Sequence, residues 1–243
     1  MKVTAKTTGL VDTSKLTSLE ITADRINETF HDMQVDSFRI QGSRLQGCVF
    51  SKIRSRQACL GSGPSMSYLD DCIFEGCDLR LSVAGNARLT RCRFVDSFLR
   101  EVIAPNLELV ECVFENTTIS SAVFHGKVMA DDVRTLGRSV NEFRGNNFSS
   151  AKLRDVGFNT GIVLADQVLP EGEEYLYIAD TSAAVAWLKN APVPKDRKAE
   201  KEYKGLLGLM SYYTSTGQKD QFMTGPFPPG FREAAATFGS LLA

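Results

Sequence analysis

Six cysteines are the residues of this chain whose type could do chemistry, as metal ligands, as nucleophiles or as disulfide partners. Three of them, Cys72, Cys92 and Cys112, recur every 20 residues, and Cys77 follows the first of them by five residues. This spacing differs from the paired CxxC arrangement of zinc sites. Such a regular repeat indicates buried thiols, which are poor nucleophiles.

Other motifs that carry chemistry are absent from the sequence. It contains no phosphate-binding loop, no GxGxxG or GxSxG turn and no HExxH helix. The two histidines, His31 and His125, lie far apart. Because no acid–base pair can be assembled from these residues, we expect a protein that is not an enzyme and that has no metal site and no cofactor.

The composition limits the class of protein. The chain has 243 residues, 43% of them apolar, and a formal net charge of −1. It can therefore bury a sizeable core, and it is neither a general nucleic-acid binder nor a strongly acidic protein by charge. Its first residues contain no apolar signal segment, and no run of about 18 apolar residues occurs. We expect a cytoplasmic protein with reduced thiols and no membrane span.

The spacing of the cysteines belongs to a repeat with a period of five residues. All thirteen positions that are met in steps of five from position 69 to position 129 are apolar, and eleven of the residues two places before them are Ser, Cys, Ala, Val or Thr. The same step continues in 30–50 and 143–163. A helix of 3.6 residues per turn cannot hold this period on one face, so the pattern excludes a helical core.

A period of five within a period of 20 predicts a coil with four sides per turn. Successive turns would stack at the inter-strand spacing of about 4.8 Å. Each side would point one Leu or Phe inward, beside one small residue. The predicted core ladder is one stack of cysteines and one of phenylalanines: Cys72, Cys92, Cys112, Phe74, Phe94 and Phe114. Cys48 and Phe50 join this ladder if the loop after them shifts the register by four residues.

The units Cys77-Asp78-Leu79 and Ala151-Lys152-Leu153 resemble those of the pentapeptide-repeat family, which read A(D/N)LxX. The resemblance covers about 11–165 and implies a right-handed quadrilateral β-helix, an all-β solenoid. The chain departs from the family pattern because the residue before the central one is seldom Asp or Asn. We expect the β-helix in 1–165, with loop insertions at about 51–68 and 130–142.

The five-residue pattern ends near position 163, and helices are expected beyond it. Asp180 can cap a helix over 183–189, a charged helix is expected over about 196–213, and a last short helix would place Phe231, Ala235, Phe238 and Leu242 on one face. The open apolar end of a stacked coil must be covered. We therefore predict that 166–243 is a helical cap or, as the family resemblance implies, a dimerisation segment.

The 20-residue period also predicts which residues share an outward column. The candidate interaction surface is an apolar side that carries few charges: Val83, Ile103, Pro105, Val123 and His125. Its own C-terminal segment, a partner protein or a second protomer could cover this side. A second candidate is a charged patch: Asp71, Arg91, Glu111, Arg80 and Arg100. Asp78, Asp96 and Glu101 lie near enough to neutralise its two stacked arginines.

These surfaces favour a protein-interaction scaffold, with another protein or a second copy as the partner. The family resemblance implies an alternative, because some pentapeptide-repeat proteins mimic DNA, bind DNA gyrase and protect it from inhibitors. That role needs an acidic surface. Residues 1–165 hold 20 Lys and Arg and 19 Asp and Glu, a net charge of +1, so only a local patch could supply it: Asp70, Asp71, Glu75, Glu111 and Glu115. The interleaved acids also argue against direct nucleic-acid binding through arginines: Arg54, Arg56, Arg88, Arg91 and Arg93.

Overall fold

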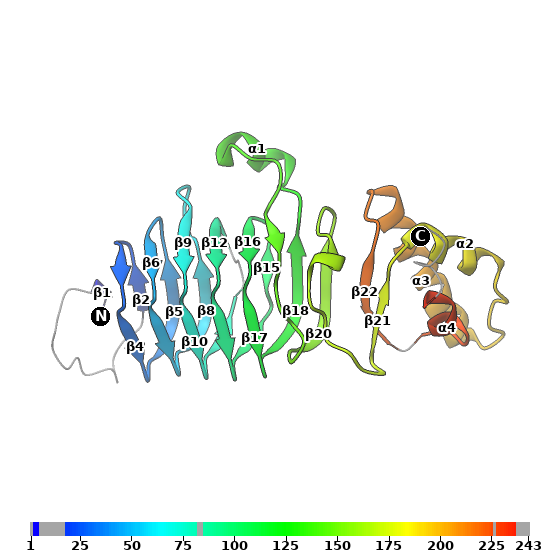
Figure 1. Cartoon of the computed structure of the whole chain (residues 1–243), viewed down its shortest axis with the longest axis horizontal. Coiled ribbons are helices and arrows are strands. Elements are labelled where there is room, and N and C mark those ends of the chain that lie inside the picture. Colours follow the sequence, from blue (N-terminus) through cyan, green and yellow to red (C-terminus); the bar gives the residue numbers. More distant parts are fainter. Residues whose placement is uncertain (1, 5–17, 82–84, 226, 237–243) are drawn as a thin grey trace.

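A computed structural model describes residues 2–4, 18–81, 85–225 and 227–236 of the chain. Figure 1 shows an elongated solenoid whose coils follow one another along the long axis, with a small helical module at the far end. The helix α1 (Ala130–Leu136) projects from one side of the solenoid.

The largest sheet of the described residues bends around a corner of the solenoid. Its nine strands run in the order β1-β2-β5-β8-β11-β14-β18-β15, and β20 also pairs with β18. β18 pairs with β14 through Thr118–Ser120 and with β15 through Val123–Phe124, so one long strand spans two sides. We call the part with β11 and β14 the first side and the part with β15 the second side. The strands are β1 (Lys2–Thr4), β2 (Ser18–Ile21), β5 (Gln34–Ile40), β8 (Arg54–Leu60), β11 (Asp78–Arg80), β14 (Phe98–Arg100), β15 (Ile103–Ala104), β18 (Thr118–His125) and β20 (Lys152–Asn159).

Two further parallel sheets form the remaining sides. The third side has the order β19-β16-β12-β9-β6-β3, and the fourth side has the order β17-β13-β10-β7-β4. The third-side strands are β3 (Arg25–Ile26), β6 (Arg44–Gln46), β9 (Ser67–Asp70), β12 (Ala87–Thr90), β16 (Leu107–Val110) and β19 (Phe143–Arg144). The fourth-side strands are β4 (Thr29–His31), β7 (Val49–Ser51), β10 (Ile73–Glu75), β13 (Arg93–Val95) and β17 (Val113–Glu115).

The strand register follows the 20-residue period. Phe74 pairs with Phe94, and Phe94 pairs with Phe114. Their rings stack with centroids 4.7 and 5.0 Å apart, and the same stack extends to Phe50 at 4.8 Å from Phe74. The expected all-β, four-sided solenoid with helices near its C-terminal end is therefore confirmed.

The small residues beside this stack hold the coils together by hydrogen bonds. Cys92 Sγ donates to the carbonyl of Leu69, 3.3 Å away in the preceding coil, and Cys112 Sγ donates to Leu89 at 3.5 Å. Both thiols are buried, as is that of Cys72. A thiol fits this position because it is small and can donate a weak hydrogen bond to a buried carbonyl of the preceding coil.

The first insertion is shorter than the sequence indicates. We expected 51–68 to leave the stack, but β7 and β8 lie within it. Val49 pairs with Ile73, 24 positions later, whereas Ile73 pairs with Arg93, 20 positions later. The coil therefore gains four residues, at the turn between β8 and β9. The five-residue pattern hides this coil because the polar Ser55 takes an inward position there and is still buried.

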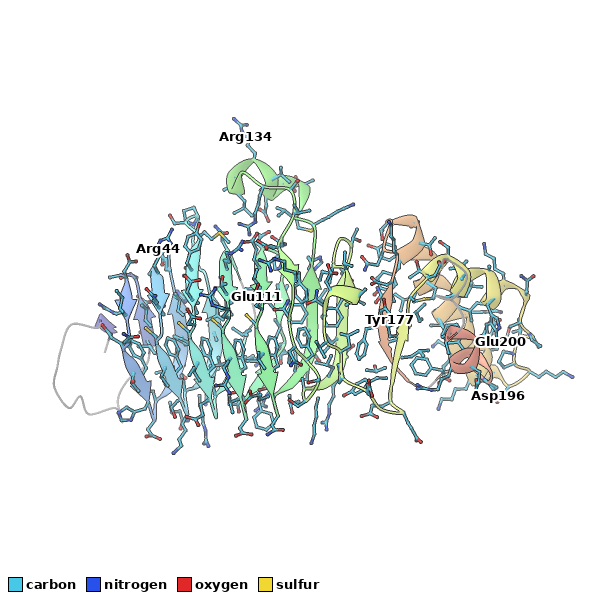
Figure 2. The ribbon with its side chains drawn as sticks, viewed as in Figure 1. Arg44, Glu111, Arg134, Tyr177, Asp196 and Glu200 are labelled. Atoms are coloured by element: carbon cyan, nitrogen blue, oxygen red, sulfur yellow. The ribbon has the colours of Figure 1, made fainter. Side chains whose placement is uncertain are left out.

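The second insertion contains α1, which has no buried residue. Leu109 pairs with Phe143, 34 positions later, so this coil gains 14 residues. Arg138 and Asn141 anchor the insertion: Arg138 Nη2 donates to the carbonyl of Asn106 at 2.8 Å, and Asn141 Nδ2 donates to those of Pro105 and His125 at 2.8 and 2.9 Å. Figure 2 shows Arg134 on α1 pointing away from the solenoid.

The C-terminal module has its own core. It contains an antiparallel strand pair that the sequence pattern did not indicate, β21 (Tyr175–Ile178) and β22 (Gln221–Thr224). The helices α2 (Thr181–Asn190) and α3 (Arg197–Ser215) lie between these strands in the chain, and α4 (Phe231–Ala235) follows them. Asp180 and Asp196 cap α2 and α3 by accepting backbone hydrogen bonds. Leu188, Met210 and Phe231 are buried together. Phe238 and Leu242 of the expected last helix lie outside the described residues.

This module covers the end of the solenoid, after a 3-10 helix η2 (Leu164–Asp166). The Asp220 carboxylate accepts hydrogen bonds from the backbone N–H groups of Leu164 and Ala165 at 2.9 and 3.2 Å. Tyr175 Oη accepts one from the N–H of Leu153 at 3.1 Å. The C-terminal segment, one of the three candidates for covering the apolar side, lies over the end of the solenoid, where its polar groups satisfy open backbone groups of the last coil.

Candidate functional site

The apolar stripe that the sequence predicts lies on the second side. Ile103 on β15 pairs with Val123 on β18, and Val123 pairs with Gly157. Ile103 is 54% exposed, which is high for a large apolar side chain. Val83 lies outside the described residues. Among the described residues, the stripe therefore consists of the exposed Ile103 and the half-buried Val123 on neighbouring strands.

Pro105 and His125 border this stripe, and both are half-buried. Their carbonyl groups hold Asn141 of the second insertion, as described above. Burial lowers the pKa of His125, so its ring is neutral at physiological pH. The base of the insertion thus forms one edge of the stripe.

The predicted charged patch separates into two places. Asp71, Arg91 and Glu111 share a corner of the solenoid, each with a φ between 52° and 58°. Arg91 donates to both carboxylate oxygens of Asp71 at 2.8 Å, and Arg144 contacts Glu111 at 2.7 Å. Arg80 and Arg100 lie on the first side instead.

The corner pairs predict a loss of stability in acid. The hydrogen bond from Arg91 lowers the pKa of Asp71 below its usual value of 3.8. A lowered carboxyl pKa adds stability above the usual value, and this stability is lost as pH falls through the lowered one. We expect Asp71→Asn to lower the urea midpoint of unfolding slightly at pH 7, and to leave it unchanged at about pH 2. An equal difference at both pH values would contradict this assignment.

The acids proposed as a DNA-like patch are mostly neutralised. Besides the pairs of Asp71 and Glu111, Glu115 accepts from Arg93 at 2.9 Å. The arginines weighed for nucleic-acid binding are dispersed. Arg88 on the third side contacts Glu108 at 3.1 Å and Glu142 at 2.6 Å, whereas Arg54 and Arg56 lie on the first side.

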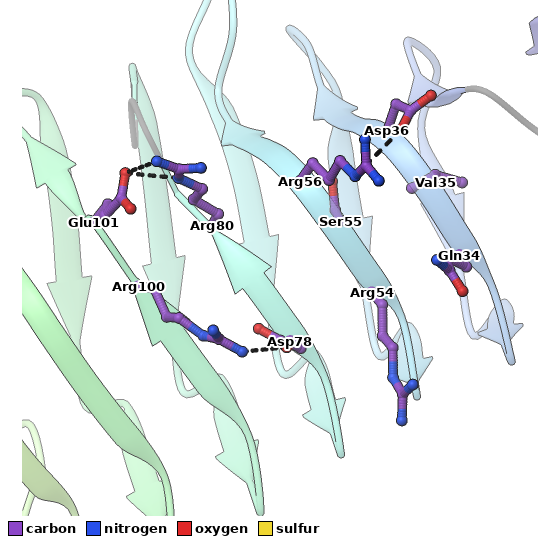
Figure 3. A pocket seen from close by; sticks show the side chains of 10 residues that line it. All are labelled: Gln34, Val35, Asp36, Arg54, Ser55, Arg56, Asp78, Arg80, Arg100 and Glu101. Atoms are coloured by element: carbon purple, nitrogen blue, oxygen red, sulfur yellow. Dashed lines mark hydrogen bonds and ion pairs between the residues drawn. The ribbon is translucent and has the colours of Figure 1, made fainter.

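The structure adds a hollow that the sequence pattern did not indicate. It has a volume of about 710 Å³, and it brings four arginines and three acids together on β5, β8, β11, β14 and the residue that follows β14 (Figure 3). The residues that line it are Gln34, Val35, Asp36, Arg54, Ser55, Arg56, Asp78, Arg80, Arg100 and Glu101. If the five-residue repeat is continued through β8, Arg56 falls beside Arg80. The repeat was not recognised there because the polar Ser55 stands at the inward position.

Three ion pairs cross this hollow. Arg80 contacts Glu101 at 2.6 Å, Arg100 contacts Asp78, and Arg56 lies 3.8 Å from Asp36. Asp78 and Glu101 therefore neutralise the stacked arginines as expected, whereas no contact of Asp96 with them is seen. In the part of the chain that the structure describes, Arg54 has no ion pair.

The described residues offer little catalytic chemistry. Burial raises the pKa of Cys77 to about 11 and also raises that of Cys92, so both thiols are protonated at neutral pH. Cys59 is half-buried, and burial raises its pKa as well. No group of three or more His, Cys, Asp or Glu among the described residues could hold a metal ion. No helix in the described part of the chain is both long and apolar enough to cross a membrane.

The fold and these surfaces define a four-sided parallel β-solenoid with a helical module at one end. No family model and no curated protein sequence matches the chain. Among solved structures it is similar to trypsin-treated QnrB1, a plasmid-mediated fluoroquinolone resistance protein. The identity is 15%, the match covers 63% of this chain and 79% of that one, and the TM-score is 0.20. The strand pairing of this chain defines its fold class independently of that match.

Proposed function

We propose that this chain is a pentapeptide-repeat protein that acts as a non-enzymatic scaffold for another protein. The observation that supports this proposal most directly is the open apolar stripe of Ile103 and Val123. Exposed apolar surface of this kind costs free energy in water and is usually covered by a partner. The stripe lies on parallel strands with a fixed register, so it presents a rigid surface.

The test compares two double variants with the same chemistry. Ile103→Asp/Val123→Asp places two charges on the second side, and Ile73→Asp/Val113→Asp places two charges at the equivalent positions of the fourth side, where both residues are half-buried. We expect the first pair alone to abolish capture of a partner, because burying an unpaired carboxylate in an interface is costly. Affinity capture, with light scattering to detect a homodimer, measures this.

Two results would contradict the proposal. One is partner capture that survives Ile103→Asp/Val123→Asp in a protein whose circular dichroism is unchanged. The other is an equal loss of capture in both variants while both keep the circular dichroism of the unmodified protein, which would show that the second side has no special part in binding. A homodimer that only the second-side variant disrupts would support the stripe as an interface between two copies.

The same capture experiment also distinguishes gyrase protection from a general scaffold role. DNA mimicry requires a net acidic surface. Asp71, Glu111 and Glu115 are each paired with an arginine. Capture of gyrase subunits, together with protection of supercoiling from an inhibitor, would favour that role over a general scaffold.

A further inference from the structure

A row of arginines on the first side departs from the charge pattern of the rest of the solenoid. Arg80 and Arg100 are direct partners on neighbouring strands. The pairing of Leu79 with Ser55 places Arg56 next in the same row. Like charges directly opposite each other destabilise a sheet, and the corner column of Asp71, Arg91 and Glu111 alternates in sign instead.

The acids near this row hold it only weakly. Arg80 and Glu101 have side chains that are 54% and 50% exposed, and those of Arg56 and Asp36 are 84% and 65% exposed. Exposed ion pairs contribute little free energy, so a ligand carboxylate can replace the acid in each of them. Asp78 lies in register with Arg54 but contacts Arg100, which leaves Arg54 available. Figure 3 shows Arg80 turning toward Glu101 and Arg100 turning toward Asp78, and both arginine side chains are about half exposed.

The shape of the surface fits an extended chain. The hollow of about 710 Å³ adjoins a second one of about 620 Å³, and both are lined by Asp36, Arg56, Arg80 and Glu101. Together they cross four strands, from β5 to β14. Three strand spacings amount to about 14 Å, the length of about four residues of an extended peptide.

We propose that the arginine row of Arg56, Arg80 and Arg100, together with Arg54 two positions earlier on β8, binds an extended acidic segment of a partner protein. This inference rests on the proposed function and adds to it the chemical character of the partner, an acidic peptide segment. A guanidinium group binds a carboxylate through two parallel hydrogen bonds. A nucleic acid fits less well, because among the described residues at this hollow only Phe98 offers an exposed ring on which bases could stack.

The test uses the full chain and a fluorescein-labelled peptide of four Glu-Ala repeats. The corresponding Gln-Ala peptide and a single-stranded oligonucleotide serve as comparison probes. We expect the acidic peptide to bind, and binding to weaken about tenfold or more in Arg80→Gln/Arg100→Gln, which removes two charge-assisted contacts. Arg91→Gln/Arg93→Gln is the matched control, because it removes the same charge from arginines that are 51% and 49% exposed on other parts of the solenoid.

Fluorescence anisotropy measures the affinities, and urea unfolding adds a second readout. Arg100→Gln should leave the midpoint nearly unchanged because Asp78 can pair with Arg54, whereas Arg91→Gln should lower it slightly, as expected for Asp71→Asn, by removing a two-fold contact. The inference is overturned if the acidic peptide does not bind, if both double variants weaken it equally, or if the oligonucleotide binds more tightly through the same arginines. Partner capture that depends on Ile103 and Val123 would leave the proposed function standing in those cases.

Discussion

Phe94→Ala should lower the free energy of unfolding by about 3–5 kcal/mol, the usual range for a fully buried phenylalanine. Phe94 is 1% exposed, and its ring lies between those of Phe74 and Phe114 with centroids 4.7 and 5.0 Å away. The cavity would sit in the middle of a continuous stack, where parallel strands on all sides prevent the coils from moving together to fill it. Urea unfolding followed by circular dichroism measures the change.

Phe98→Ala is the control for this substitution. Phe98 is four residues away on the first side and 49% exposed, so its loss should cost within about 1 kcal/mol. Equal effects of the two substitutions would show that the stack does not determine stability. The comparison separates burial from the mere loss of an aromatic ring.

Asn146→Ala should be nearly as damaging, with a loss of about 2–5 kcal/mol, because it removes a hydrogen bond from each of two buried backbone groups. Asn146 Oδ1 accepts from the N–H of Cys112 at 3.0 Å, and its Nδ2 donates to the carbonyl of Leu109 at 2.9 Å. The side chain is fully buried and also contacts Gln167, which in turn donates to the carbonyls of Phe143 and Val163. The Asn146 amide therefore connects Leu109 and Cys112 of one coil to Gln167 after the next.

Asn190→Ala provides the comparison, since Asn190 is exposed and only donates to the carbonyl of Ala186 in its own helix. Its loss should change the free energy of unfolding by about 0.5 kcal/mol or less, because water can take its place. Thermal unfolding of both variants measures the difference. A small effect of Asn146→Ala would mean that water enters the end of the solenoid and satisfies these groups.

The two outward surfaces have different consequences for a partner. The stripe of Ile103 and Val123 would supply apolar burial, which gives affinity without strong direction. The arginine row would supply paired hydrogen bonds, which fix orientation and depend on salt. Both belong to the same bent sheet, so a partner that contacts both would cross the corner between the first and second sides.

The sequence by itself determined the coil and its register. A repeat of one inward residue in five imposes the same local conformation on each side, so Phe74, Phe94 and Phe114 could be placed above one another from spacing alone. The sequence also indicated that helices begin after Asp180 and Asp196. Each capping side chain bonds to backbone N–H groups only two or three positions later, so the signal is local. In each case the deciding contacts recur in the sequence or lie next to one another.

Only the tertiary structure decided how the remaining parts meet. β8 stays in the stack despite the polar Ser55 because β5 and β11 pair with it on both sides. The C-terminal module covers the end and not the second side because Asp220 reaches backbone groups 55 and 56 positions earlier. Asp78 forms its ion pair with Arg100 and not with Arg54, and this depends on the side-chain rotamers on neighbouring strands. Such contacts join residues with no fixed sequence spacing, and therefore no period predicts them.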